Sequence, residues 1–258
     1  MRKWLLILYF LGGNFLSGEI FLKNKLVEAD IGSYIVTEQN KNFTLFYIRE
    51  KFDRTILIEE VTIPARRDIY KFNWKVWFEN GAPGHTSWTI SYVNLDNGQF
   101  EGIFSFNHNS WIQISDSNSF LTTLLNLPFN LIPEENRRRI GSSSSHNKSN
   151  YSSIWHPFLT IEGQRICIPF TAWHAYWPSD GTHLANKCIE IYLPEDIDTN
   201  TVPDYPTYFP YWIGIEGKVG SMRLRVVDSG KSAKSPKNIP SEAHIFSFLN
   251  IEKNYSLS

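Results

Sequence analysis

Residues 88–100 read Trp-Thr-Ile-Ser-Tyr-Val-Asn-Leu-Asp-Asn-Gly-Gln-Phe, and this stretch decides the fold class. Large apolar residues at 88, 90 and 92 alternate with Thr89 and Ser91, the period of two that is typical of a strand with one buried face. The triplet Asp96–Gly98 then indicates a hairpin turn, because Asn-Gly tolerates positive φ. The stretch therefore predicts antiparallel β-structure.

The same alternation recurs along the chain. It is present at residues 72–78 and 222–226, and Asp228–Gly230 resembles a second, weaker turn. Helix signals are few: Ser119 is placed to cap a helix over 120–127, and residues 133–141 carry the proline, acids, bases and glycine of a short helix. We therefore expect an all-β fold with little helix.

Short segments of the first half of the chain recur in the same order in the second half. The pairs are Glu60–Pro64 with Glu190–Pro194, Phe72–Trp74 with Phe209–Tyr211, Asp96–Gly98 with Asp228–Gly230, and Ile103–Phe106 with Ile245–Phe248. Residues 141–153 between them are polar and of low complexity, which is typical of a linker. We expect two tandem antiparallel β-sandwich-like domains, 19–140 and 154–258, joined by this linker. The alternative is a single sandwich with one long excursion.

The N-terminus has the pattern of a secretory signal. Met-Arg-Lys is followed by a short apolar stretch and by small residues up to Gly18. We expect residues 1–18 to be a signal peptide and the mature protein to be periplasmic or secreted. No later apolar run is long enough to span a bilayer, which takes about 20 residues, so we expect no transmembrane span in the mature chain.

The chain has two cysteines, Cys167 and Cys188. An even count in an exported chain favours a disulfide. In each strand the cysteine alternates with isoleucines, so both sulfurs lie off the apolar face, as cross-strand neighbours would. We expect a Cys167–Cys188 disulfide; the alternative is two separate thiols.

The composition argues against nucleic acid as a partner. The formal net charge is −1, which provides no drive toward a polyanion. The basic run at 137–139 is explained by the last turn of the short helix, where cations are favoured. The sequence contains no cofactor motif, and we expect none to be bound.

Aromatic residues make up 15% of the chain, with nine tryptophans. Exposed aromatic side chains bind sugars, peptides or bases by stacking. On strand parity and local clustering, the candidate ligand-binding residues are Trp77, Trp173, Trp177 and Trp212. The alternative is that these tryptophans belong to a core with both strand faces buried.

No catalytic or metal motif is present in the sequence. His174, Asp180 and His183 could hold a divalent ion, but their spacing matches no standard site, and Asp180 is explained by a turn at Asp-Gly. We expect no metal site. No G-x-S-x-G elbow is present, and among the acids Glu59, Glu60, Asp180, Glu190 and Glu216 nothing selects a catalytic pair.

Several segments resemble uncharacterised exported proteins of chlamydia-type bacteria. They are Gly81–Trp88, Pro133–Gly141, Trp177–Gly181 and Tyr211–Gly230. The resemblance implies an envelope or secreted setting and carries no activity. We expect a non-enzymatic binding or envelope-interaction protein whose ligand is a glycan or a protein of the envelope or exterior. The alternative is a periplasmic hydrolase acting on a glycan or peptide.

Overall fold

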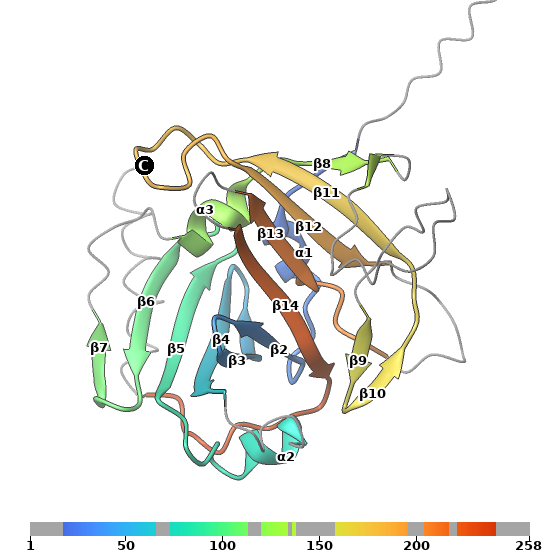
Figure 1. Ribbon diagram of the computed structural model, residues 1–258. Helices are drawn as coiled ribbons and strands as arrows, with labels where there is room; N and C mark the ends of the chain where they lie inside the picture. The colour runs from blue at the N-terminus through green and yellow to red at the C-terminus, as the bar shows by residue number, and fades with distance from the viewer. Residues whose placement is uncertain are drawn as a thin grey trace, which may run out of the picture.

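The protein is built around one large antiparallel sheet. The computed structural model describes residues 18–65, 73–112, 120–133, 136–137, 158–195, 204–216 and 221–240. Within these ranges it contains a 14-stranded sheet and three short helices (Figure 1). The all-β expectation is therefore confirmed at the level of a mostly antiparallel β-fold.

The strands in the first half are β1 (Glu19–Ile20), β2 (Tyr34–Gln39), β3 (Asn42–Phe52), β4 (Thr55–Pro64), β5 (Ser87–Asn94), β6 (Phe100–Ser105), β7 (Ser110–Ile112) and β8 (Phe129–Ile132). The strands in the second half are β9 (Leu159–Ile161), β10 (Gln164–Ile166), β11 (Phe170–Tyr176), β12 (Cys188–Pro194), β13 (Trp212–Glu216) and β14 (Ser221–Gly230). The helices are α1 (Leu22–Val27), α2 (Trp74–Glu79) and α3 (Phe120–Asn126).

One sheet crosses the expected domain boundary. Its order is β1-β8-β11-β12-β13-β14-β2-β3-β4-β5-β6-β7, with β9 pairing β14 and β10 pairing β9. β14 of the second half is hydrogen-bonded to β2 of the first, and β8 to β11. The structure therefore does not show two separate tandem sandwiches, because strands of the first half are hydrogen-bonded to strands of the second half within one sheet. The expected linker 141–153 lies outside the described residues.

The stretch 88–100 forms the predicted hairpin. β5 pairs with β6 around the turn, and Gly98 has a φ of 67°. The weaker turn prediction at Asp228–Gly230 is wrong. Asp228 and Gly230 pair with Val36 and Tyr34 as the end of β14, after a register shift that follows Val226.

The predicted strand over 72–78 is also wrong, because residues 74–79 form α2. Asn73 caps the helix by accepting a hydrogen bond from the Val76 backbone N–H at 3.1 Å. Trp74, Trp77 and Phe78 have helical i, i+3, i+4 spacing and are all buried. Trp74 and Phe78 are four residues apart, which fits both a helix and a period of two, so this pair alone does not distinguish the two; Val76 between them is 49% exposed, as a helix requires.

The expected disulfide between Cys167 and Cys188 is absent from the structure. In the β11–β12 pair Cys188 lies opposite Tyr176, at the far end from Phe170. Cys167 lies three residues before Phe170, near the other end of β11, and a strand of seven residues spans about 20 Å, whereas a disulfide needs Cα atoms within about 7 Å. Strand parity does not fix which ends of two strands meet, so it could not exclude this arrangement.

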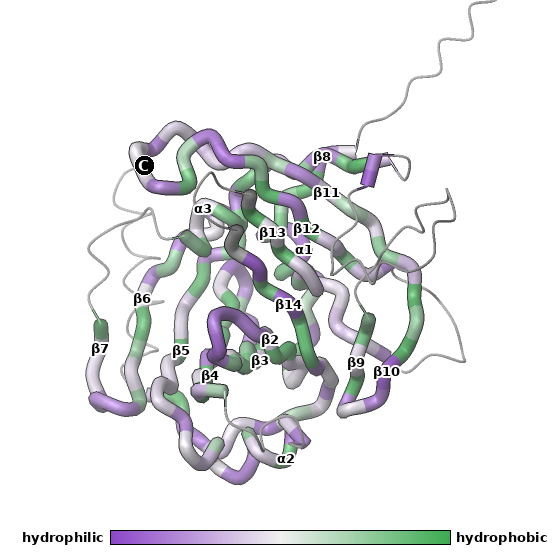
Figure 2. The backbone as a smooth tube through the Cα atoms, in the orientation of Figure 1, coloured by the Kyte–Doolittle hydropathy of each residue, from purple (hydrophilic) through white to green (hydrophobic). Residues whose placement is uncertain are grey.

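Helix α2 and the segment 231–240 cover one face of β2–β5. The buried side chains there include Phe43, Leu45, Val61, Ile63, Trp74, Trp77, Phe78, Trp88 and Ala233. Figure 2 shows apolar residues along the strands and hydrophilic ones in the loop between β6 and β7. This face is filled by the chain's own side chains.

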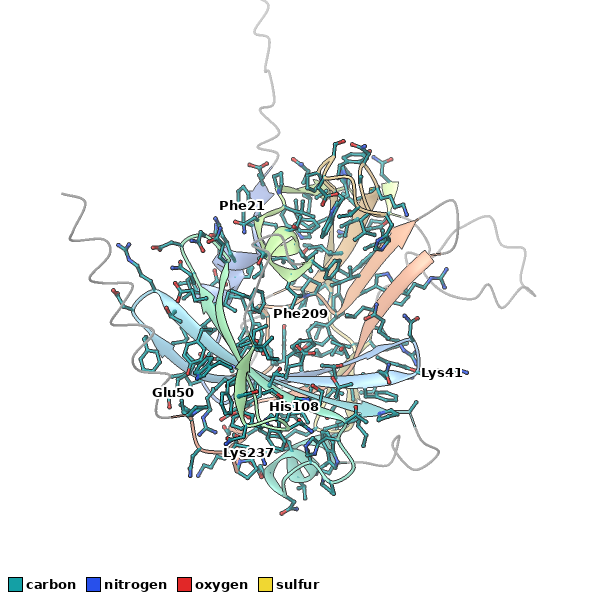
Figure 3. All side chains as sticks on the ribbon, turned by 90° about the vertical axis from the view of Figure 1, so that its left-hand side faces the viewer. Phe21, Lys41, Glu50, His108, Phe209 and Lys237 are labelled. Atoms are coloured by element: carbon teal, nitrogen blue, oxygen red, sulfur yellow. The ribbon has the colours of Figure 1, made fainter. Side chains whose placement is uncertain are left out.

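The opposite face of β3–β6 packs toward α1, α3 and the segment 204–211. Phe209 of that segment packs against three buried clusters, one in each neighbouring part of the sheet. Figure 3 shows Phe209 near the centre of the molecule, between the strands of the first half and those of the second. The two halves are therefore packed together around this side chain.

Candidate functional site

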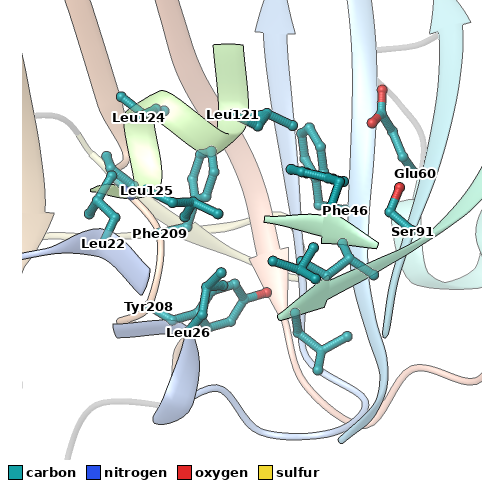
Figure 4. Close-up of a pocket in the computed structure, with 15 residues that line it drawn as sticks. Leu22, Leu26, Phe46, Glu60, Ser91, Leu121, Leu124, Leu125, Tyr208 and Phe209 are labelled. Atoms are coloured by element: carbon teal, nitrogen blue, oxygen red, sulfur yellow. The ribbon is translucent and has the colours of Figure 1, made fainter. Parts of the chain in front are cut away.

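A partly open cavity of about 60 Å³ lies between the sheet and the two helices α1 and α3. β3–β6 form one wall, and α1, α3 and residues 208–210 form the other (Figure 4). The wall residues are Leu22, Leu26, Phe46, Ile48, Ile58, Glu60, Ser91, Val93, Phe100, Leu121, Leu124, Leu125, Tyr208, Phe209 and Pro210. Most of these side chains are apolar, which is typical of a small-molecule site with few polar groups.

The strand register explains why two polar groups enter this apolar wall. Glu60 of β4 lies opposite Phe46 of β3, and Ser91 of β5 lies opposite Ile58 of β4. Glu60 and Ser91 are thus diagonal neighbours on one face, with Cα atoms about 7–8 Å apart. Figure 4 shows both on the same side of the cavity. One polar group of a ligand could therefore contact both.

The cavity has a deep end and a rim. Ile48 and Val93 are fully buried and Ser91 is 6% exposed, whereas Glu60 is only half-buried. The ring of Phe46 on the sheet wall stacks on the ring of Phe209 on the opposite wall, with centroids 5.8 Å apart. A ligand would therefore have its apolar part among the buried side chains and its polar part near Glu60.

Glu60 is the one carboxyl group on the cavity wall among the described residues. Burial raises its pKa above the ordinary value, because the charged form is poorly solvated there. In the described part of the chain no hydrogen bond or ion pair to Glu60 is present to offset this cost. The carboxyl group is therefore available to a ligand that supplies a proton donor or a positive charge.

The four predicted tryptophans do not form an exposed binding surface. Trp77 is 6%, Trp177 3% and Trp212 8% exposed, and Trp173 is half-buried. The indole N–H of Trp77 donates to the Pro83 carbonyl at 3.2 Å, and that of Trp177 to Asp180 at 2.8 Å. Trp173 donates to Thr171 at 2.8 Å. Trp77, Trp177 and Trp212 are therefore core residues, which was the alternative interpretation.

His174, Asp180 and His183 do not form a metal site. His174 is on β11, opposite Asn130 and Glu190, while Asp180 lies in the turn after Trp177. Asp180 is occupied by hydrogen bonds from Thr182 and Trp177, which hold its pKa below the usual range. Within the described residues no group of three or more metal-ligating side chains is present.

One feature of the sequence, combined with strand parity, indicates a polar group on this wall of the cavity. Glu59 and Glu60 are adjacent in strand 56–63, whose other residues are apolar apart from Thr62. Neighbouring residues of a strand point to opposite faces, so a strand buried on both sides must bury one acid on each. The partners on the other wall, Leu121 and Phe209, come from distant segments and could not be assigned to it from sequence.

In the part of the chain that the structure describes, no helix is long and apolar enough to cross a membrane. The described helices have six or seven residues each. This finding concerns helices alone.

Comparisons with known proteins agree with the fold. A family model described as CT021 protein matches residues 44–167. The solved structure of the hypothetical protein CT021 from Chlamydia trachomatis is similar to this chain with a TM-score of 0.60 and 20% sequence identity. The match covers 86% of this chain and 98% of that one. No curated protein matches the chain. The expected likeness to proteins of chlamydia-type bacteria is confirmed, since residues 44–167 match the CT021 protein family model and the fold is similar to that of the chlamydial protein.

Proposed function

We propose that this protein is a non-enzymatic binding protein that holds a compact apolar ligand in the cavity between α1, α3 and β3–β6. The observation that carries the proposal is the cavity itself, with an apolar interior and polar Glu60 and Ser91 on one wall. Such a combination provides affinity through apolar burial and orientation through a few polar groups.

The geometry supports binding better than hydrolysis. Glycoside hydrolysis commonly uses two carboxyl groups that flank one bond. Among the described residues the cavity wall has only Glu60, because Glu59 points to the opposite face of β4, and Glu190 lies on β12. The cavity therefore has the features of a binding site and not those of an acid–base pair.

The proposal predicts that hexan-1-ol binds to the protein and that filling the cavity prevents this. Leu125 of α3 is a half-buried wall residue, so Leu125→Trp should occupy the space that the alkyl chain needs. We expect isothermal titration calorimetry at pH 7.5 to show binding to the wild type and at least about tenfold weaker binding to Leu125→Trp.

Leu131→Trp is the matched control, because Leu131 is 42% exposed on β8 and is not part of the wall. It should bind hexan-1-ol as the wild type does. Leu121→Trp, on the same helix as Leu125, repeats the test should the first variant fold poorly. A wild type that binds no hexan-1-ol, or cavity variants that bind it undiminished, would refute the proposed function.

We further propose that binding takes place outside the cytoplasm, in the periplasm or beyond the cell. The support is the basic start, short apolar stretch and small residues of segment 1–18, which lies outside the described residues apart from Gly18. We expect intact-mass analysis of protein from its native host to give a chain without this segment. A mass that includes Met1 to Gly18 would contradict the removal of a signal peptide.

A further inference from the structure

We infer that the cavity selects small amphiphiles with a primary ammonium group, bound with the ammonium at Glu60 and the alkyl chain among the buried side chains. This inference rests on the proposed function, since it names the ligand class for the same cavity. Its starting point is that the apolar wall contains one carboxyl group without a charged partner in the described part of the chain.

Charge complementarity decides the sign of the ligand. A carboxylate that is moved out of water without a partner is unfavourable, and burial accordingly raises the pKa of Glu60. An ammonium group restores the ion pair and donates up to three hydrogen bonds, two of which have acceptors in Glu60 and Ser91. A ligand carboxylate would instead place two negative charges together.

The position of Glu60 decides the orientation. Glu60 is half-buried, whereas Ile48 and Val93 at the deep end are fully buried. A ligand must therefore carry its charge at the rim and its apolar chain inward. In a lysine side chain of a peptide the ammonium is at the distal end, so it would have to enter the cavity before the apolar methylene groups. The geometry thus favours a free alkylammonium compound over a protein's lysine.

The test compares three six-carbon probes on the intact protein by calorimetry at pH 7.5. Hexan-1-amine is protonated at this pH, as a lysine amine is. We expect it to bind about tenfold more tightly than hexan-1-ol, the difference typical of a charge-assisted hydrogen bond, and hexanoate to bind more weakly than either. Nα-acetyl-lysine N-methylamide, the peptide arm, should bind more weakly than hexan-1-amine.

Glu60→Gln tests the residue, because glutamine keeps the shape and removes the charge. We expect the preference for hexan-1-amine over hexan-1-ol to disappear, while hexan-1-ol still binds and so reports an intact cavity. Glu162→Gln is the matched control, since Glu162 is exposed and is not part of the cavity wall. It should keep the full preference.

The outcomes separate the two proposals. Equal binding of hexan-1-amine and hexan-1-ol by the wild type, or a preference that survives Glu60→Gln, overturns the ammonium inference and leaves the binding function in place. Tighter binding of the lysine derivative than of hexan-1-amine overturns the orientation and points to a peptide. Failure of all the probes to bind overturns both the inference and the proposed function.

Discussion

Arg49→Met is expected to lower the free energy of unfolding by about 3–5 kcal/mol, the cost typical of leaving a buried charge without its partner. Glu59 is 1% exposed, and its carboxylate lies 3.3 Å from the Arg49 guanidinium. Methionine matches the length of the arginine side chain but supplies neither charge nor donors. Urea unfolding at pH 7.5, followed by tryptophan fluorescence, would measure the loss.

Arg49 also holds the segment 231–240 on the sheet. Its guanidinium donates to the backbone carbonyls of Lys237 at 2.8 Å and Ser235 at 3.4 Å. Glu59 accepts from the Trp88 indole at 3.0 Å and from the Ser235 hydroxyl at 2.8 Å. Lys237, which is labelled in Figure 3, belongs to this segment, and its ammonium lies 5.0 Å from the centroid of the Trp88 ring. Loss of Arg49 therefore removes both the counter-charge and two backbone anchors.

Arg54→Met is the matched control. Arg54 pairs with Asp96 at 3.0 Å, but both side chains are more than half exposed, so the change should cost less than about 1 kcal/mol. Glu59→Gln added to Arg49→Met should recover part of the loss, because it removes the unpaired charge. Equal losses for Arg49→Met and Arg54→Met would show that the buried pair contributes nothing special.

The sequence was informative where one strand face is buried and the other is not. The alternation at 88–92 and the turn at 96–98 specify β5, β6 and their hairpin with local information alone. The prediction of a helix near residue 120 is also confirmed, since α3 covers Phe120–Asn126. In these segments local preference and tertiary packing agree.

The sequence was misleading where a pairing between distant residues decides the outcome. Nothing local shows that β14 pairs with β2 across almost the whole chain, which is what joins the two halves in one sheet. The same holds for the cavity, whose walls meet only when Phe209 packs against Phe46. The burial of Trp77, Trp177 and Trp212 has a related reason: strand parity says which side a residue faces but not whether that side is covered.

The second large effect is expected for Asp228→Asn, as a change in how stability depends on pH. Asp228 is 3% exposed in β14, and burial raises its pKa from 3.8 to about 6. We expect the stability of Asp228→Asn relative to wild type to increase by about 2 kcal/mol between pH 4 and pH 7. Urea unfolding of both proteins across this range would measure the difference.

The sign follows from the protons bound in each state. Because the folded pKa is higher than the unfolded one, the folded wild type binds more protons between pH 3.8 and about 6. The contribution of Asp228 to stability is therefore fully present below pH 3.8 and is lost as the pH rises through 6. Asparagine does not titrate, so the variant does not lose this contribution.

The surroundings of Asp228 show why asparagine should fit. The carboxylate accepts from the Gly163 backbone N–H at 2.9 Å and from the Tyr34 hydroxyl at 3.4 Å. The amide oxygen of asparagine can keep the first bond, and its NH₂ can donate to the tyrosine oxygen. The site cannot relax by opening, because Tyr34 is fully buried and its ring lies against Gly230, where an added Cβ would be 2.7 Å away.

Asp180→Asn provides a control of opposite sign. Hydrogen bonds from Thr182 hold the pKa of Asp180 below its usual value, so the wild-type aspartate stabilises the protein above the unfolded pKa and loses this effect as the pH falls. The stability of Asp180→Asn relative to wild type should therefore decrease as the pH rises. A difference between Asp228→Asn and wild type that stays constant, or that changes in the same direction as for Asp180→Asn, would show that burial does not govern the ionisation of Asp228.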